Sequence, residues 1–293
     1  MDKIEIDRLR RKREYMVAQH NEYVRKSRFD LSVAEQKAVA YICSLIKPVK
    51  DKDRDTIPFQ TEYEFEILDY ANVCGIAKCG RLYIDTKAVF ERLMQRIIQI
   101  DTRDGTILLA WLTEAFIPKE AGLVKLILNI KLEPYLHALS SNRTQYALLN
   151  ILAMRSKYSI RIYELMRSFA FEKEVTYKFD EFKYRLAVNE IKTYNRFCDF
   201  KRRVIDPAIE EINHLTDLII TYEVTRKSNI VTHIKFNIRE KTLMEMAASQ
   251  ERIYRQIDTK TILEDGDAPI PHFHPEMSEL RKQYEEHRAK QKQ

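Results

Sequence analysis

Residues 194–213 read YNRFCDFKRRVIDPAIEEIN, and this stretch decides the fold prediction. Its apolar residues recur at spacings of three and four, which predicts a helix with one buried stripe. The stripe consists of Phe197, Phe200, Val204, Ala208 and Ile212. Charged residues occupy the other face, namely Asp199, Arg202, Arg203 and Asp206, with Arg196 at its N-terminal edge and Lys201 at the margin of the stripe. The helix therefore presents a cluster of arginines on its outer side.

An arginine can grip the O6 and N7 atoms of guanine with two hydrogen bonds, so this face fits the major groove of DNA. A charged helix face is more often simply solvated, and the neighbouring segments must decide between the two interpretations. Pro207 lies in mid-helix, where it removes a hydrogen bond and favours a kink. We expect Asp206 to cap a restarted helix there.

The segments on either side of this helix predict a winged helix-turn-helix. Residues 218–224 and 230–238 alternate and are rich in β-branched and aromatic residues, which indicates a hairpin with a basic tip at residues 226–229. Upstream, residues 174–179 indicate a strand, and a short helix capped by Asp180 follows. In a winged helix the second helix enters the major groove and the hairpin contacts phosphates.

The charge distribution supports a nucleic-acid partner. The chain has 50 Lys+Arg against 44 Asp+Glu, a net charge of +6. Residues 155–204 hold thirteen basic and seven acidic residues, and residues 1–28 hold nine and five. The positive potential is therefore concentrated on the N-terminal segment and the arginine helix, as expected of a DNA-binding protein.

The chain is long enough for two domains, and it lacks an apolar run that could cross a membrane or serve as a signal segment. Its cysteines are Cys43, Cys74, Cys79 and Cys198, too few for a disulfide framework in a chain of this size. We expect reduced thiols in a cytoplasmic protein.

The first half of the chain repeats the order of elements around the arginine helix. Ser32 and Glu35 form a capping box before an amphipathic helix. A strand and short helix follow, then a longer helix over residues 81–98, a hairpin turning at Asp104-Gly105, and a strand over residues 123–130. We predict an α+β protein with two tandem winged-helix domains. The expected boundaries are a basic helical arm at 1–28, the first domain at 29–150, the second at 151–240, and a polar, partly disordered tail at 241–293.

Three motifs carry a family resemblance: NEYVRKSRFDLSVAEQKAVAYI at 21–42, RSKYSIRIYELM at 155–166, and the arginine helix with its hairpin. Over about residues 21–240 the chain resembles the replication initiator (Rep) proteins of iteron-containing, theta-replicating plasmids. The resemblance implies two winged helices that bind directly repeated origin sequences. It also implies that monomers initiate replication, that dimers repress the protein's own gene at an inverted repeat, and that host replication proteins are partners.

The resemblance and the charge pattern together predict the DNA-binding residues. The positions that match the family's base-reading arginines are Arg196, Arg202 and Arg203. The residues expected to contact phosphates are Lys201, Arg226, Lys227, Asn229, His233, Arg81 and Lys87. The helix over residues 81–98 offers Arg81, Thr86, Lys87 and Arg92 without an arginine cluster, so the first domain should contribute less base readout. The apolar strands at 106–112 and 123–130 are expected to expose an edge that pairs with a second copy.

Other functions are weaker. His272-Phe273-His274 followed by Tyr284 imitates the metal and tyrosine pattern of a nicking nuclease, but the flanking Pro271 and Pro275 argue against a central strand. Cys74 and Cys79 lack partners for zinc, and no GK[ST] follows the nearby glycines. We therefore predict no enzyme activity, no metal and no cofactor. A transcription regulator with tandem winged helices remains the alternative, because it would share the same DNA-binding features.

Overall fold

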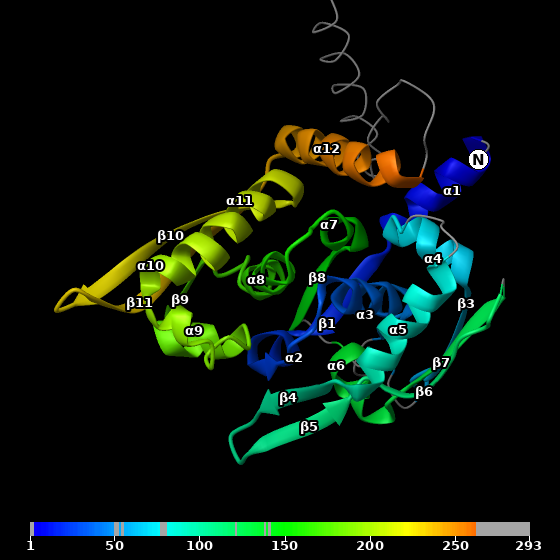
Figure 1. Cartoon of the computed structure of the whole chain (residues 1–293), viewed down its shortest axis with the longest axis horizontal. Coiled ribbons are helices and arrows are strands. Elements are labelled where there is room, and N and C mark those ends of the chain that lie inside the picture. Colours follow the sequence, from blue (N-terminus) through cyan, green and yellow to red (C-terminus); the bar gives the residue numbers. More distant parts are fainter. Residues whose placement is uncertain are drawn as a thin grey trace, which may run out of the picture.

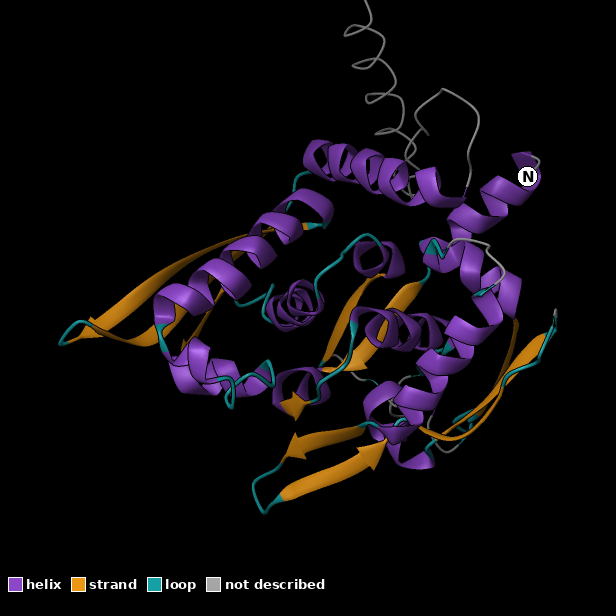
Figure 2. Cartoon of the chain, viewed as in Figure 1, coloured by secondary structure: helices purple, strands orange, loops and turns teal. Residues whose placement is uncertain are grey.

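The computed structural model places two winged-helix lobes on either side of a central helix, α8 (Lys157–Ser168) (Figure 1, Figure 2). The lobe at the left of Figure 1 comes from the second half of the chain, and the lobe at the right comes from the first half. The structure describes residues 3–49, 53, 56–76, 81–120, 122–137, 139 and 142–261.

The second lobe has the predicted order of strand, helix, turn, helix and hairpin. Its elements are β9 (Glu174–Lys178), α9 (Phe179–Arg185), η3 (Lys192–Asn195), α10 (Phe197–Phe200), η4 (Lys201–Ile205), α11 (Asp206–Leu215), β10 (Leu218–Lys227) and β11 (Ile230–Glu240). The strands pair in the order β10-β11-β9, and β11 is antiparallel to both neighbours. Asp180 does not cap α9 as predicted, because the cap is Lys178 and Asp180 lies in the first turn.

Aromatic rings join the helices of this lobe to its sheet. Phe182 of α9 lies between Phe236 of β11 and Phe200 of α10, with ring centroids 5.0 Å and 6.1 Å away. All three side chains are fully buried. Burying a ring of this size contributes about 1.5–3 kcal/mol. The cluster therefore fixes how the arginine helix lies on the sheet.

The first lobe repeats this topology with one insertion. Its elements are α3 (Val33–Leu45), β3 (Glu62–Glu66), α4 (Ile67–Cys74), α5 (Leu82–Gln95), β6 (Leu112–Phe116) and β7 (Leu123–Leu128). The predicted capping box of Ser32 and Glu35 is present at the start of α3. The strand order β3-β7-β6 reproduces β9-β11-β10, so β6 and β7 form the wing of this lobe. The Asp104-Gly105 hairpin, which we expected to occupy the wing position, is an extra element.

This extra hairpin consists of β4 (Ile97–Asp101) and β5 (Thr106–Ala110), and it pairs with β2 (Ser27–Arg28) in the order β2-β4-β5. Its loop spans residues 102–105, closed by a hydrogen bond from the Thr102 amide to the Gly105 carbonyl, and is longer than the tight turn expected. Strand β5 is one edge of this sheet, and no strand among the described residues pairs with its outer side. Strand β7 is central in its own sheet, so our prediction that residues 123–130 form an exposed edge is wrong.

The N-terminal segment is not the separate helical arm predicted for residues 1–28. After α1 (Lys3–Arg13), strand β1 (Met16–His20) pairs with β8 (Arg143–Ala147), and α2 (Asn21–Lys26) follows. Arg13 is fully buried and donates to the carbonyls of Val73 and Asn72 at the end of α4. The basic charge of this segment therefore caps a helix of the first lobe.

Helix α8 (Lys157–Ser168) is buried between the two lobes. A 3-10 turn η2 (Ile130–Leu132), α6 (Glu133–Leu136) and α7 (Leu148–Leu152) precede it in the chain. Arg161 of α8 donates from Nη2 to the carbonyls of Val24 and Ser27, at 3.0 Å and 2.7 Å. Burial lowers the pKa of its guanidinium, and it also raises the pKa of the Glu164 carboxyl nearby.

A second set of contacts joins the lobes beside α8. Arg185 of α9 donates to the Lys26 carbonyl and to Oδ2 of Asp101 in β4, both at 2.7 Å. Arg28 donates to Asn189 at 3.2 Å and lies over the ring of Tyr184. The interface is thus held by charged side chains with specific acceptors, which favours one relative orientation of the lobes.

The predicted polar tail begins with a helix. Helix α12 (Leu243–Thr261) buries Ala247, Ile253, Tyr254 and Ile257, so the expectation of a tail from residue 241 is wrong over this range. Residues 262–293, which include the histidine and tyrosine motif considered for a nuclease, lie outside the described residues.

We predict that Arg161→Ala lowers the free energy of unfolding by about 3–5 kcal/mol, because it leaves buried polar groups without their partner. Arg226→Ala, at an exposed site, should change it by no more than about 0.5 kcal/mol. Urea unfolding followed by circular dichroism measures both. Equal midpoints for the two variants would contradict the role assigned to Arg161.

Candidate nucleic-acid interface

The arginine helix is continuous but contains a π-helical turn before Pro207. Segments α10, η4 and α11 follow one another without a break, and the Asp206 amide donates to the Lys201 carbonyl five residues back. A π-turn accommodates a proline because the wider spacing leaves room for its ring and does not need its missing N–H. Asp206 makes no capping hydrogen bond, contrary to our prediction. Pro207 lies instead in the first turn of α11.

The helix buries the predicted stripe and exposes the predicted arginines. Phe200, Val204, Ala208 and Ile212 are buried, and Phe197 is half-buried. The side chains of Arg196 and Arg202 are 78% and 71% exposed. The stripe therefore fixes the helix on its lobe and leaves its arginine face open.

Asp199 organises two of the three arginines. Its carboxylate oxygens lie 3.5 Å from Nε of Arg196 and 3.1 Å from Nη2 of Arg202. Arg203 is exposed and has no polar partner among the residues that the structure describes. Guanine would therefore compete with Asp199 for Arg196 and Arg202, whereas Arg203 can bind without losing an internal contact.

The wing is tied to this helix through Tyr222 of β10. The Tyr222 hydroxyl donates to Oδ1 of Asp206 at 2.7 Å, and Lys201 Nζ lies 3.8 Å from the other oxygen of that carboxylate. The pKa of the Tyr222 hydroxyl is raised, mainly because the group is partly buried and also because it donates a hydrogen bond to Asp206. The half-exposed Lys201 thus lies between the helix and the wing.

A tight turn places the basic tip of the wing. Ser228 and Asn229 have φ angles of 49° and 65°, the left-handed region used in two-residue hairpin turns. Arg226 donates to the Asn229 carbonyl at 3.2 Å, and Lys227 is exposed. Ile230 is 70% exposed beside them. Of the two cations at the tip, Arg226 lines the same groove as Lys201 of the helix.

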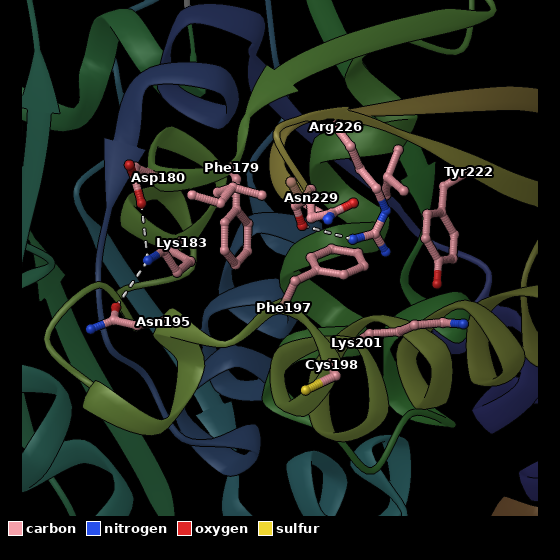
Figure 3. Close-up of a pocket in the computed structure, with 13 residues that line it drawn as sticks. Phe179, Asp180, Lys183, Asn195, Phe197, Cys198, Lys201, Tyr222, Arg226 and Asn229 are labelled. Carbon is pink, nitrogen blue, oxygen red and sulfur yellow. Dashed lines mark hydrogen bonds and ion pairs between the residues drawn. The ribbon is translucent and has the colours of Figure 1, made fainter.

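A groove of about 620 Å³ separates the wing tip from the start of the helix (Figure 3). Lys201, Arg226 and Asn229, which are among the residues predicted to contact phosphates, line this groove. Lys183 also lines it, and sequence reasoning missed this residue. Its Nζ lies 3.2 Å from Asn195 Oδ1 and 3.0 Å from Asp180 Oδ1, and the side chain as a whole is buried. The groove therefore has two exposed cations, Lys201 and Arg226, that can bind phosphate oxygens, and the buried Lys183 at its wall.

His233 is not placed with these residues. Ile234 and Phe236 of β11 point into the core, so His233 lies on the opposite face of the sheet with Lys235, which pairs with Glu174. The structure therefore separates His233 from the groove and from the arginine face.

The first lobe presents fewer free cations at the equivalent helix. Arg81 and Lys87 of the α5 region lie 3.8 Å and 3.3 Å from Asp85 and Glu91. Arg92 and Arg96 both lie 3.5 Å from the buried carboxylate of Glu35. Thr86, which we expected on the outer side, is buried. The wing sheet of this lobe exposes Glu62, Glu64 and Glu66. These pairings disfavour a base-reading role for α5 and support backbone positioning.

Comparison with known proteins agrees with this geometry. The family model described as "Initiator Replication protein, WH1" matches residues 16–167, and the one described as "Initiator Rep protein, WH2" matches residues 178–238. The chain belongs to the initiator Rep protein family. Both the predicted family and the predicted pair of winged helices are confirmed.

Individual relatives are distant from this Rep protein. An Escherichia coli protein named "Replication initiation protein" is 25% identical over 236 residues, which cover 72% of this chain and 71% of the relative. An "Uncharacterized 27.6 kDa protein" of Escherichia coli is 24% identical over 178 residues, covering 60% and 74%. A solved structure of domains 2 and 3 of RctB aligns with a TM-score of 0.43 at 10% identity, covering 72% of this chain and 85% of that one.

The cysteines that the structure describes divide between the core and the groove. Cys43 and Cys74 of this Rep protein are buried, and burial raises the pKa of both thiols to about 12. Cys79 lies outside the described residues, and Cys198 lines the groove. Within the described ranges no cluster of His, Cys, Asp and Glu is arranged as a metal site, and no helix is long and apolar enough to cross a membrane.

We predict that Arg203→Ala and Arg226→Ala weaken DNA binding in different ways. Loss of Arg203 should relax preference at one base position by about 1–3 kcal/mol, the value of a bidentate contact. Loss of Arg226 should weaken binding to all sequences and reduce the salt slope by about one unit. Filter binding over a salt series, on selected and scrambled DNA, separates the two effects. Full sequence preference in Arg203→Ala would contradict the assignment.

Proposed function

We propose that this Rep protein is a plasmid replication initiator that binds directly repeated double-stranded sequences at an origin and assembles host replication proteins there. The observation that carries the proposal is the arginine face of the second lobe, where Arg203 is exposed and has no polar partner among the described residues. The basic wing tip adds to it, because Arg226 lines one groove together with Lys201 of the helix. Membership of the initiator Rep family implies DNA binding and supports the initiator role. The proposed activity is binding and assembly, without a catalytic step.

The two lobes have different tasks in this proposal. The second lobe reads bases through Arg196, Arg202 and Arg203, while Lys201 and the wing-tip residues Arg226, Lys227 and Asn229 hold phosphates. The first lobe binds the backbone through α5, where Arg81 and Lys87 can exchange their exposed carboxylate partners for phosphates. Two major-groove contacts one turn apart make a site of about 20 base pairs. A chain with two unequal lobes binds such a site in one direction, which suits direct repeats.

Footprinting on the DNA that flanks the gene tests this function. We predict several evenly spaced protections of about 20 base pairs in one orientation, and loss of replication when these repeats are deleted from a vector that has no other origin. A single isolated operator, without any effect on replication, would instead indicate the alternative function of a transcription regulator.

Autorepression as a dimer belongs to the same proposal, with the inverted repeat at the protein's own promoter as its target. The free edge strand β5 supports it. Ile107 and Leu108 of β5 are 38% and 63% exposed, and Ile97 of β4 is 48% exposed on the same face as Leu108. Pairing of two β5 edges about a twofold axis would place a neighbouring strand beside Ile107 on one face of the sheet and beside Leu108 on the other. In such a dimer the twofold axis relates the two arginine helices, which suits an inverted repeat. Direct repeats need neighbouring chains that face the same way along the DNA, so dimerisation competes with binding to them.

We predict that Leu108→Lys shifts the protein towards monomer, because it places a charge on the proposed shared face. Binding to the inverted repeat should weaken and binding to direct repeats should strengthen. Phe171→Lys, at a side chain that is 95% exposed far along the chain from β5, is the matched control. Analytical ultracentrifugation with gel shifts on both DNAs measures the outcome. A parent protein that stays monomeric at about tens of micromolar would refute the dimer.

A further inference from the structure

Helix α12 lies outside the segments that match the family and contacts both lobes. In Figure 1 it runs across one side of the molecule, from the end of α11 towards α1 and α4. Its bounds, Leu243–Thr261, follow the last family-matched residue, 238. It begins with a capping box, in which the Thr242 amide donates to Glu245 and the Glu245 amide donates to the Thr242 hydroxyl. This local signal makes it a defined helix.

The first half of α12 is fixed to the second lobe. Arg239 at the end of β11 donates to both carboxylate oxygens of Glu245, each at 2.8 Å, which lowers the pKa of Glu245 to about 2. Buried Lys241 donates to the Ser249 hydroxyl at 2.7 Å. Arg252 reaches the carbonyl of His214 in α11 at 3.4 Å. These contacts attach α12 beside the C-terminal end of α11.

The second half of α12 is fixed to the first lobe. Ile257 packs against Gly75 at the end of α4, so closely that a Cβ added to Gly75 would lie 2.8 Å from Ile257 Cγ2. The Tyr254 hydroxyl donates to Glu14 at 3.3 Å, and the Arg10 guanidinium lies over the Tyr254 ring. Two features require glycine at position 75. Its φ of 65° lies in the left-handed region, and α12 packs directly against it.

We propose that α12 is a clasp that fixes the rotation of the second lobe about α8, and thereby positions the two DNA-binding helices for one site. The lobes are joined along α8 and by the Arg185–Asp101 contact on one side. On the other side of the molecule, α12 spans the distance from α11 of the second lobe to the end of α4 in the first lobe (Figure 1). Ile257, Tyr254 and Gly75 are positioning residues in this arrangement. The inference rests on the proposed two-lobe DNA binding.

The physical reason is preorganisation. When two binding modules are held in the correct geometry, the second contact forms within the molecule and needs no further ordering. A lobe that can rotate loses part of this gain, although it keeps its own intrinsic affinity for DNA. Release of the clasp should therefore weaken binding to a complete site and leave binding by the second lobe alone unchanged.

Ile257→Asp tests the clasp, with Met244→Asp on the exposed side of the same helix as the control. Small-angle scattering of the free protein should give a larger radius of gyration for Ile257→Asp alone. On a DNA site selected by the parent chain, Ile257→Asp should bind about tenfold more weakly. It should bind the half-site of the second lobe as well as the parent does. Unchanged scattering and unchanged affinity for the complete site would overturn the proposal.

A second variant approaches the same contact from the other lobe and introduces no charge. Gly75→Ala should displace Ile257 and reproduce the open state, with the larger radius of gyration and the weaker binding to the complete site expected of Ile257→Asp. A Gly75→Ala protein with the scattering and the binding of the parent would overturn the clasp. The scattering result does not depend on DNA, so a parent that selects no DNA site would refute the proposed function and still leave the clasp to be decided by scattering.

Discussion

Burial of α8 between two lobes is the constraint on which the structure depends. Its Arg161 guanidinium is fully enclosed and must find acceptors, since an unpaired buried charge costs several kcal/mol. It finds them in the carbonyls of Val24 and Ser27, which belong to the first lobe. The same helix packs against α11 of the second lobe. The orientation of the arginine helix relative to the first lobe is therefore set by hydrogen-bond geometry as well as by apolar packing.

The two winged helices have the same topology and different surfaces. In the second lobe a π-turn before Pro207 keeps the helix continuous, and its outer face carries arginines beside a basic wing. In the first lobe Arg92 and Arg96 are directed to the buried Glu35, and carboxylates lie on the wing sheet. A shared fold thus supplies one base-reading lobe and one lobe that positions the backbone, which gives the chain a direction along DNA.

Local patterns in the sequence predicted the second lobe well, because its helix stripe, its hairpin and its basic tip are encoded in short segments. The first wing was assigned wrongly because Asp104-Gly105 gives the stronger local hairpin signal, whereas the choice of wing depends on distant pairing with β3. Helix α12 was missed although Thr242 and Glu245 form a capping-box pattern, since its first half buries only the small residues Ala247 and Ser249 and so shows a weak apolar stripe. Lys183 was missed because its role comes from Asn195, twelve residues away and close only in the fold.

Native-state hydrogen exchange across α8 tests most directly whether the lobes behave as one unit. If burial of α8 makes the two lobes one cooperative unit, the amides of α8 and of both cores share one opening free energy. Arg161→Ala then lowers that free energy for all of them together. Separate opening of the second lobe, at a much lower free energy than α8 and the first lobe, would contradict it.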